Sequence, residues 1–172
     1  MKRSFLFLSM LCFVAFASAQ QLPSADAILK EAREQAAKEN KKVMVVFHAS
    51  WCGWCRKMDT SLNDPSVKSF FDKNYVITHL TIDESPDKKN LENPGAQILN
   101  EKWGGKDQGI PFWVIMDKDG KILADSQREV GKNVGCPATA EEVAHFIKVL
   151  KKTSSITNEE IAAVEKRFRR NE

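Results

Sequence analysis

Residues 43–58 read VMVVFHASWCGWCRKM, and this stretch decides the fold. Residues 43–47 are apolar and mostly β-branched, which is typical of a strand buried on both faces. Cys52 and Cys55 follow, and residues 54–62 are predicted to form a helix. Two thiols three positions apart at a helix start can form a disulfide, and the free N–H groups of the first turn stabilise the first thiolate. The pattern predicts thiol–disulfide exchange, with Cys52 as a solvent-accessible attacking thiol and Cys55 as the more buried resolving thiol.

The first nineteen residues predict a cleaved secretory signal peptide. Lys2 and Arg3 precede an apolar run over residues 5–16, and the small residues of Ala17-Ser18-Ala19 form a cleavage pattern before Gln20. The run is shorter than the roughly 20 apolar residues that a membrane span needs. We therefore expect a periplasmic or secreted mature protein that starts after Ala19 and has no stable membrane insertion.

Length and charge narrow the function further. The chain has 172 residues, and about 150 residues is the usual size of one domain with a real core. The formal net charge is +3, so removing Lys2 and Arg3 leaves +1 (3 − 2), which gives no reason to expect nucleic acid as a partner. The mature chain keeps three cysteines, Cys52, Cys55 and Cys136, which suit redox work better than a stapled scaffold.

The mature chain predicts alternating helices and strands. Helices are expected at residues 24–40, 54–62, 64–74, 93–104, 139–150 and 157–168, strands at 43–47 and 75–82, and a β-hairpin at 109–124. Long crossovers make the first two strands parallel, whereas the hairpin is antiparallel. The prediction is an α/β fold, a mixed central sheet flanked by helices, in a single domain over residues 20–172 with its core at about 42–150. The charged residues of 83–93 and 165–172 are expected to be solvated surface, with a frayed tail from Arg167.

Two motifs together resemble the thioredoxin superfamily: FHASWCGWC at residues 47–55, and Gly109-Ile110-Pro111 before the hairpin. The likeness covers about residues 42–150 and is greatest to exported bacterial thioredoxin-like proteins. It implies a thioredoxin-like fold with a cis peptide bond before Pro111, beside the disulfide, where backbone pairs with an extended substrate. The residues expected to contact substrate are Trp51, Gly53, Trp54, Ile110 and Pro111.

Three positions depart from thioredoxin. Val46 stands where thioredoxin has a buried Asp, and His79 stands where that Asp has a Lys partner. Any proton shuttle must therefore be water, His48 or His79. Trp54 replaces a Pro between the cysteines, a position that tunes the redox potential, so thioredoxin's strongly reducing value does not carry over.

Several residues also have purely structural interpretations. Trp51 is expected to pack against the sheet and Trp54 to contact clients, while His48 is expected to be a hydrogen-bonded histidine at a strand end. Cys136 is expected to be a small buried residue in a turn. The packing role is expected for the remaining tryptophans, Trp103 and Trp113.

The function expected from the sequence is an exported thiol–disulfide oxidoreductase that reduces protein disulfides through Cys52 and Cys55. Its partners would be protein thiol or disulfide clients and a membrane redox partner, with no cofactor and no metal. The alternatives are an isomerase or oxidant of secreted proteins, and a non-catalytic binding module with a structural disulfide. A zinc site built from Cys52, Cys55, His48 and Cys136 is disfavoured, because only Cys-x-x-Cys has ligand spacing.

Overall fold

A computed structural model describes residues 22–172, and the predicted signal peptide with its cleavage site lies outside this range. The central sheet has four strands in the order β2-β1-β3-β4. Their bounds are β1 Lys42–His48, β2 Tyr75–Thr81, β3 Phe112–Met116 and β4 Ile122–Asp125. As predicted, β1 pairs in parallel with β2, and the hairpin strands β3 and β4 are antiparallel. Strand β1 lies between β2 and β3, so it is a central strand, as its apolar sequence requires.

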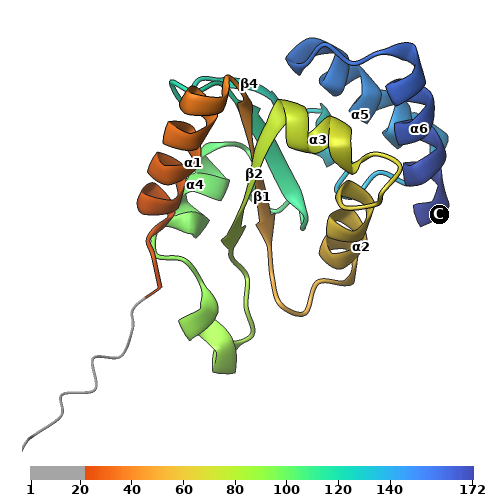
Figure 1. The fold of residues 1–172 in the computed structure, drawn as a ribbon. Coiled ribbons are helices and arrows are strands. Elements are labelled where there is room, and N and C mark those ends of the chain that lie inside the picture. Colours follow the sequence, from red (N-terminus) through yellow and green to blue (C-terminus); the bar gives the residue numbers. More distant parts are fainter. Residues whose placement is uncertain (1–21) are drawn as a thin grey trace, which may run out of the picture.

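Helices cover both faces of the sheet (Figure 1). One face carries α1 Ala25–Glu39 and α4 Ala96–Lys102. The other carries α2 Gly53–Leu62, α3 Lys68–Asn74, α5 Ala140–Thr153 and α6 Asn158–Phe168. Alternate residues of β1 serve the two cores, because successive side chains of a strand point to opposite faces. Met44 and Val46 pack toward α2 and α5, whereas Val43, Val45 and Phe47 pack toward α1.

Three predicted helix starts are confirmed by their caps. The Ser24 hydroxyl accepts the N–H of Ala27 at the start of α1. The boxes Thr139-x-x-Glu142 and Thr157-x-x-Glu160 both form, each with reciprocal side-chain and backbone hydrogen bonds. Capping residues predict helix starts because their side chains accept hydrogen bonds from N–H groups that every helix leaves unpaired in its first turn.

Two helices predicted to start at an Asp-Pro or Asn-Pro pair begin later in the structure than predicted. Asp64-Pro65 forms a turn, in which Asp64 accepts the N–H and hydroxyl of Ser66, and α3 begins only at Lys68. Helix α4 begins at Ala96 rather than after Asn93, because the Asn93 side chain accepts the Thr81 N–H instead of capping the helix.

The segment after β2 and the chain terminus are more ordered than predicted. Residues 83–93 contain a 3₁₀ helix, η1 Pro86–Leu91, and Glu84 within this segment is buried. The predicted frayed tail is wrong: Arg167, Phe168 and Asn171 are buried, and η2 Arg169–Asn171 extends the last helix. A small hairpin, β5 Gln127–Glu129 with β6 Lys132–Asn133, was not predicted, since its short polar strands carry no apolar alternation.

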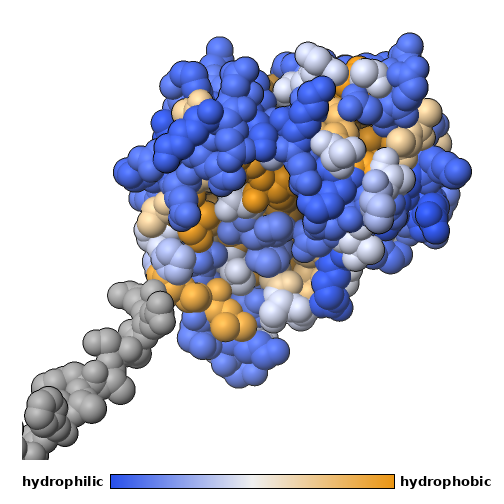
Figure 2. Space-filling model, in the orientation of Figure 1, coloured by the Kyte–Doolittle hydropathy of each residue, from blue (hydrophilic) through white to orange (hydrophobic). Residues whose placement is uncertain are grey.

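Helices within residues 22–172 are all too short or too polar to span a membrane. The hydrophilic surface of the face shown in Figure 2 is interrupted by scattered apolar residues.

The pairing of the strands brings the end of β1, the end of β2 and the start of β3 to one edge of the domain, where the Cys-x-x-Cys motif lies.

Candidate active site

Cys52 and Cys55 form a disulfide at the N-terminus of α2, with a Cα–Cα distance of 5.3 Å. Cys52 is the N-cap of this helix, and its Sγ accepts the N–H of Cys55 at 3.0 Å. The local sequence dictates this arrangement, because β1 ends at His48 and only Ala49, Ser50 and Trp51 separate it from Cys52. The helix N-terminus therefore offers its partial positive charge to the sulfur that the sequence predicts to attack.

The accessibility predicted for Cys52 is wrong for the oxidised pair. Cys52 is only 3% exposed and Cys55 only 2% exposed. Ala49 and the half-buried Ile110 pack against the two cysteines as a small apolar cluster. Burial of both sulfurs follows from this packing, which the position of Cys52 at a helix start does not reveal.

The Ile110–Pro111 peptide bond is cis, as the resemblance implies. It precedes β3, and the carbonyl oxygen of Ile110 lies 3.6 Å from Cys52 Sγ. Neither sulfur of a disulfide carries a proton, so this is a contact rather than a hydrogen bond. The Asn133 side chain holds the segment from the other side by donating to the carbonyl oxygens of Gln108, Gly109 and Pro111.

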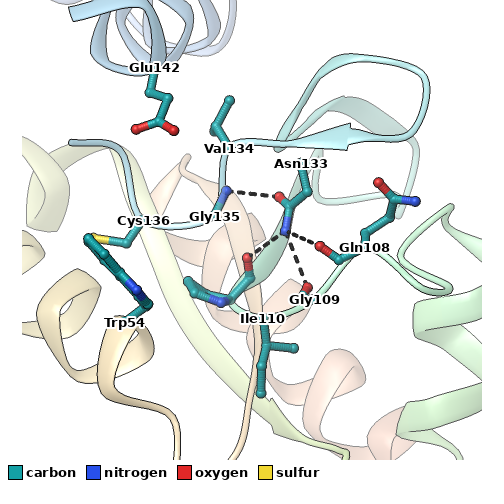
Figure 3. A pocket seen from close by; sticks show the side chains of 10 residues that line it. Trp54, Gln108, Gly109, Ile110, Asn133, Val134, Gly135, Cys136 and Glu142 are labelled. Carbon is teal, nitrogen blue, oxygen red and sulfur yellow. Dashed lines mark hydrogen bonds between the residues drawn. The ribbon is translucent and has the colours of Figure 1, made fainter. Parts of the chain in front are cut away.

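A pocket of about 230 Å³ opens beside this segment (Figure 3). It is lined by Trp54, Gln108, Gly109, Ile110, Pro111, Asn133, Val134, Gly135, Cys136 and Glu142. Trp54 is 48% exposed, and the Lys57 Nζ lies 4.3 Å from the centre of its ring. The fold thus brings together three of the residues predicted to contact substrate, Trp54, Ile110 and Pro111. Asn133 and Glu142 were missed, because the segment of Asn133 carries no motif and the motif that contains Glu142 predicts a helix cap rather than a site.

Trp51 lies outside this pocket. The prediction that it packs against the sheet is wrong, because more than half of its side chain is exposed. It is 56% exposed, and its indole N–H donates to the carbonyl oxygen of Asp83 at 2.8 Å. Gly53, the first residue of α2, does not line the pocket either. Trp113 is fully buried, and Trp103 packs against Phe47 with ring centres 5.8 Å apart, so the packing expected of these two tryptophans is confirmed.

His48 at the end of β1 and His79 in the adjacent strand β2 are linked by a series of side-chain contacts. His48 Nε2 lies 3.2 Å from the Thr81 hydroxyl, so His48 is hydrogen-bonded as predicted. His48 and His79 have ring centres 5.0 Å apart, and His79 Nε2 lies 2.8 Å from Asp59 Oδ1. Burial, and then the neighbouring His79, lower the pKa of His48. His79 of β2 pairs in register with Val46 of β1. These are the two positions at which thioredoxin has a Lys and an Asp, respectively. A proton-shuttle role for either histidine stays a prediction.

Cys136 is a free, buried thiol, as predicted. Burial raises its pKa from 9.0 to about 12, which keeps it protonated and unreactive at neutral pH. Its sulfur accepts the side-chain N–H of Asn171 at 3.4 Å. Within residues 22–172 no three His, Cys, Asp or Glu side chains are grouped to hold a metal, so the four ligands of the alternative zinc site are not assembled.

The sequence matches the thioredoxin-like protein family over residues 25–118. The chain belongs to the thioredoxin-like family. Its architecture, a mixed four-stranded sheet flanked by helices, is the thioredoxin-like fold. The match includes the Cys pair and the cis-Pro segment, so both motifs that carried the resemblance lie inside the family's own boundaries.

The individual proteins that this chain resembles share only a low sequence identity with it. A protein disulfide-isomerase from Zea mays is 26% identical over 121 residues, which cover 69% of this chain and 18% of the maize protein. This chain thus spans less than a fifth of that relative. A disulphide isomerase from Xylella fastidiosa Temecula1 is 23% identical, with a TM-score of 0.47, over 67% of this chain and 80% of that one. The oxidised C-terminal domain of DsbD from Neisseria meningitidis is 23% identical, with a TM-score of 0.43, over 77% and 98%.

Proposed function

We propose that this protein is a thiol–disulfide oxidoreductase that acts on protein clients. The observation that carries the proposal is the Cys52–Cys55 disulfide at the start of α2, in contact with the carbonyl oxygen of Ile110 before the cis-Pro. Family membership and the maize disulfide-isomerase relative support the same chemistry. Two neighbours of the pair, Trp54 and Ile110, line an open pocket, which a purely structural disulfide would not need.

The reaction needs only the two cysteines and the client. In the reduced protein, the Cys52 thiolate attacks one sulfur of a client disulfide, forms a mixed disulfide and releases the other client sulfur as a thiolate. The Cys55 thiolate then attacks Cys52 Sγ, which breaks the mixed disulfide and releases the second client thiolate. Two electrons pass from the protein to the client, and the product is the observed Cys52–Cys55 disulfide. An external dithiol must reduce this disulfide before the next turnover.

The surroundings of Cys52 support its assignment as the attacking residue. The first turn of α2 and the Cys55 N–H stabilise negative charge on its sulfur. Cys55 lies one turn into the same helix and accepts no such N–H from a helix start. Trp54, Ile110 and Pro111 offer an apolar wall and a backbone segment on which an extended client can lie, with Trp51 and Gly53 beside the same cysteine.

Trapping of mixed disulfides tests the proposal directly. Cys55→Ser, made together with Cys136→Ser so that only one thiol remains in the mature chain, should accumulate mixed disulfides with a reducible protein client. Cys52→Ser in the same background is the matched control and should trap none. If Cys55→Ser also traps nothing while the wild-type dithiol is intact, the protein is a binding module with a structural disulfide.

The direction of electron flow and the location belong to the same proposal. We propose that the protein is exported after cleavage following Ala19 and that it reduces clients, supplied with electrons by a membrane partner. The signal-like residues 1–19 support export. Mass spectrometry of the protein recovered from the periplasm or medium should find Gln20 as its first residue. Refolding of a scrambled disulfide protein separates the isomerase and oxidant alternatives from a reductase.

A further inference from the structure

Glu84 is a buried acid held against the active-site loop. It is 3% exposed, and it is the single buried Asp or Glu among residues 22–172. It lies just after β2, and the exits of β1 and β2 are joined by the hydrogen bond from the Ile82 N–H to the His48 carbonyl oxygen, at 2.9 Å. In Figure 1 the segment after β2 and the β1–α2 loop lie at the same end of the sheet. A buried carboxylate is costly unless its oxygens are hydrogen-bonded, so its partners matter.

Both carboxylate oxygens of Glu84 accept hydrogen bonds from one residue, Ser50. The Ser50 N–H donates to Oε1 at 2.5 Å, and the Ser50 hydroxyl donates to Oε2 at 2.8 Å. The Ser50 carbonyl oxygen in turn accepts from the Arg56 guanidinium at 3.0 Å. Ser50 belongs to no strand or helix, so the polar groups of its backbone are satisfied by the side chains of Glu84 and Arg56.

The same segment also holds the next residue. The Trp51 indole N–H donates to the Asp83 carbonyl oxygen, and Asp83 adopts the left-handed conformation with φ +52°. The segment is itself anchored, because the Glu84 N–H donates to Glu92 Oε1 at 2.8 Å. Residues 83–84 thus fix residues 50–51, and Cys52 follows directly.

Glu84 keeps its charge in this setting. Although burial opposes ionisation, the two hydrogen bonds from Ser50 and the positive potential of Lys88 and His48 together lower the pKa of Glu84. No cation of residues 22–172 forms a salt bridge with Glu84. Because Cys52 is two residues beyond Ser50, a backbone span of at most about 7 Å, we take the separation between the carboxylate and the Cys52 sulfur to be on the order of 8 Å.

We propose that Glu84 is a positioning residue of the dithiol: its carboxylate fixes Ser50, and through Ser50 it places Cys52 against the first turn of α2. This inference rests on the proposed exchange function and deepens it. The negative charge of Glu84, which no salt bridge offsets within residues 22–172, also opposes the thiolate of Cys52 and so favours the disulfide over the dithiol. Glu84 touches neither sulfur in the hydrogen-bond network, so it acts only through Ser50 and through its field.

Glu84→Gln and Glu84→Ala separate position from charge. The amide of Gln can accept the Ser50 N–H and donate to the Ser50 hydroxyl, so it keeps the geometry and removes the charge. Glu84→Gln should therefore keep the wild-type protection of the Ser50 amide but shift the equilibrium with glutathione toward the dithiol, with the exchange rates changed by no more than that shift. One unit charge at about 8 Å changes an equilibrium between about twofold and about thirtyfold, for an effective dielectric constant between about 80 and about 20. Glu84→Ala should slow exchange about tenfold or more, because small displacements of reacting atoms have effects of this size.

The experiment compares wild type, the two variants and the matched control Asp87→Asn, an exposed acid of the same segment. It measures the glutathione equilibrium, the rate of exchange, the alkylation rate of reduced Cys52, and the hydrogen exchange of the Ser50 amide. Glu84→Ala should speed Ser50 amide exchange, and Asp87→Asn should match wild type in every measurement. The proposal is overturned if folded Glu84→Ala keeps the wild-type exchange rate and Ser50 protection. If that variant does not fold, an unshifted equilibrium in Glu84→Gln overturns it.

Failure of the proposed function gives a different result. Wild-type protein would then show no exchange with glutathione at all. The alkylation rate of Cys52 after chemical reduction and the Ser50 amide exchange would still decide the role of Glu84, because neither depends on turnover.

Discussion

Replacing Phe168 by Ala should destabilise the whole domain, although Phe168 lies four residues from the end of the chain. Its side chain is fully buried, with its ring centre 4.9 Å from that of Phe146 in α5 and 6.3 Å from that of Phe71 in α3. Removing a buried Phe side chain costs about 3–5 kcal/mol of unfolding free energy. In a domain of about 150 residues, each kcal/mol lowers Tm by about 2–4 °C. The expected loss in Phe168→Ala is therefore about 6–20 °C.

Urea and thermal unfolding of the oxidised mature protein measure this loss. Lys166→Ala is the matched control, since Lys166 is exposed on the same helix and should change the free energy of unfolding by less than about 0.5 kcal/mol. A loss below about 1 kcal/mol in Phe168→Ala would show that α6 is not packed on α3 and α5. The site depends on this packing, since the Asn171 carbonyl oxygen just beyond α6 accepts from Lys57 of α2.

Three further predictions concern titration and capping. Because burial lowers the pKa of His48 and of His145, the unfolded chain binds more protons than the folded protein just below pH 6.5. Stability should therefore fall as the pH drops from about 7 to about 5, and less steeply in His48→Asn/His145→Gln; an unchanged slope would contradict this assignment. With its pKa raised from 9.0 to about 12, Cys136 has about a thousandfold less thiolate, so iodoacetamide should modify it in urea but hardly in the folded protein. Equal rates would contradict its burial. Glu142→Ala should cost about 1 kcal/mol of unfolding free energy, whereas Glu142→Gln should keep the capping box; equal losses would show that the cap is not the cause.

The parts of the fold that sequence predicted are those with local signals. The apolar run of β1, the Cys-x-x-Cys motif, the cis-Pro segment and the capping boxes each act through neighbouring residues. Helical crossovers then required β1 and β2 to be parallel, and the short hairpin turn required β3 and β4 to be antiparallel. Apart from the cis bond before Pro111, which the resemblance to the thioredoxin superfamily implied, these features follow from a few residues and from backbone hydrogen bonding.

The parts that escaped prediction depend on contacts between distant segments. Glu84 looks like one more charged loop residue until the fold places it beside Ser50, thirty-four positions away. Asn171 sits in a charged tail, yet it hydrogen-bonds to Ser61 and Pro137 in the core. The burial of Cys52 depends on Ile110, which comes from another strand start. Local composition carries no information about such pairs.

In the proposed function, Cys52 and Cys55 exchange electrons reversibly with other thiols. The most direct measurement is the equilibrium of the mature Cys136→Ser protein with defined glutathione buffers at pH 7. We expect a reversible two-electron transition; a reductase should lie near the thioredoxin value of about −270 mV, and an oxidant nearer about −120 mV. A disulfide that neither forms nor breaks reversibly across these buffers would be a structural cross-link, and the proposed function would be wrong.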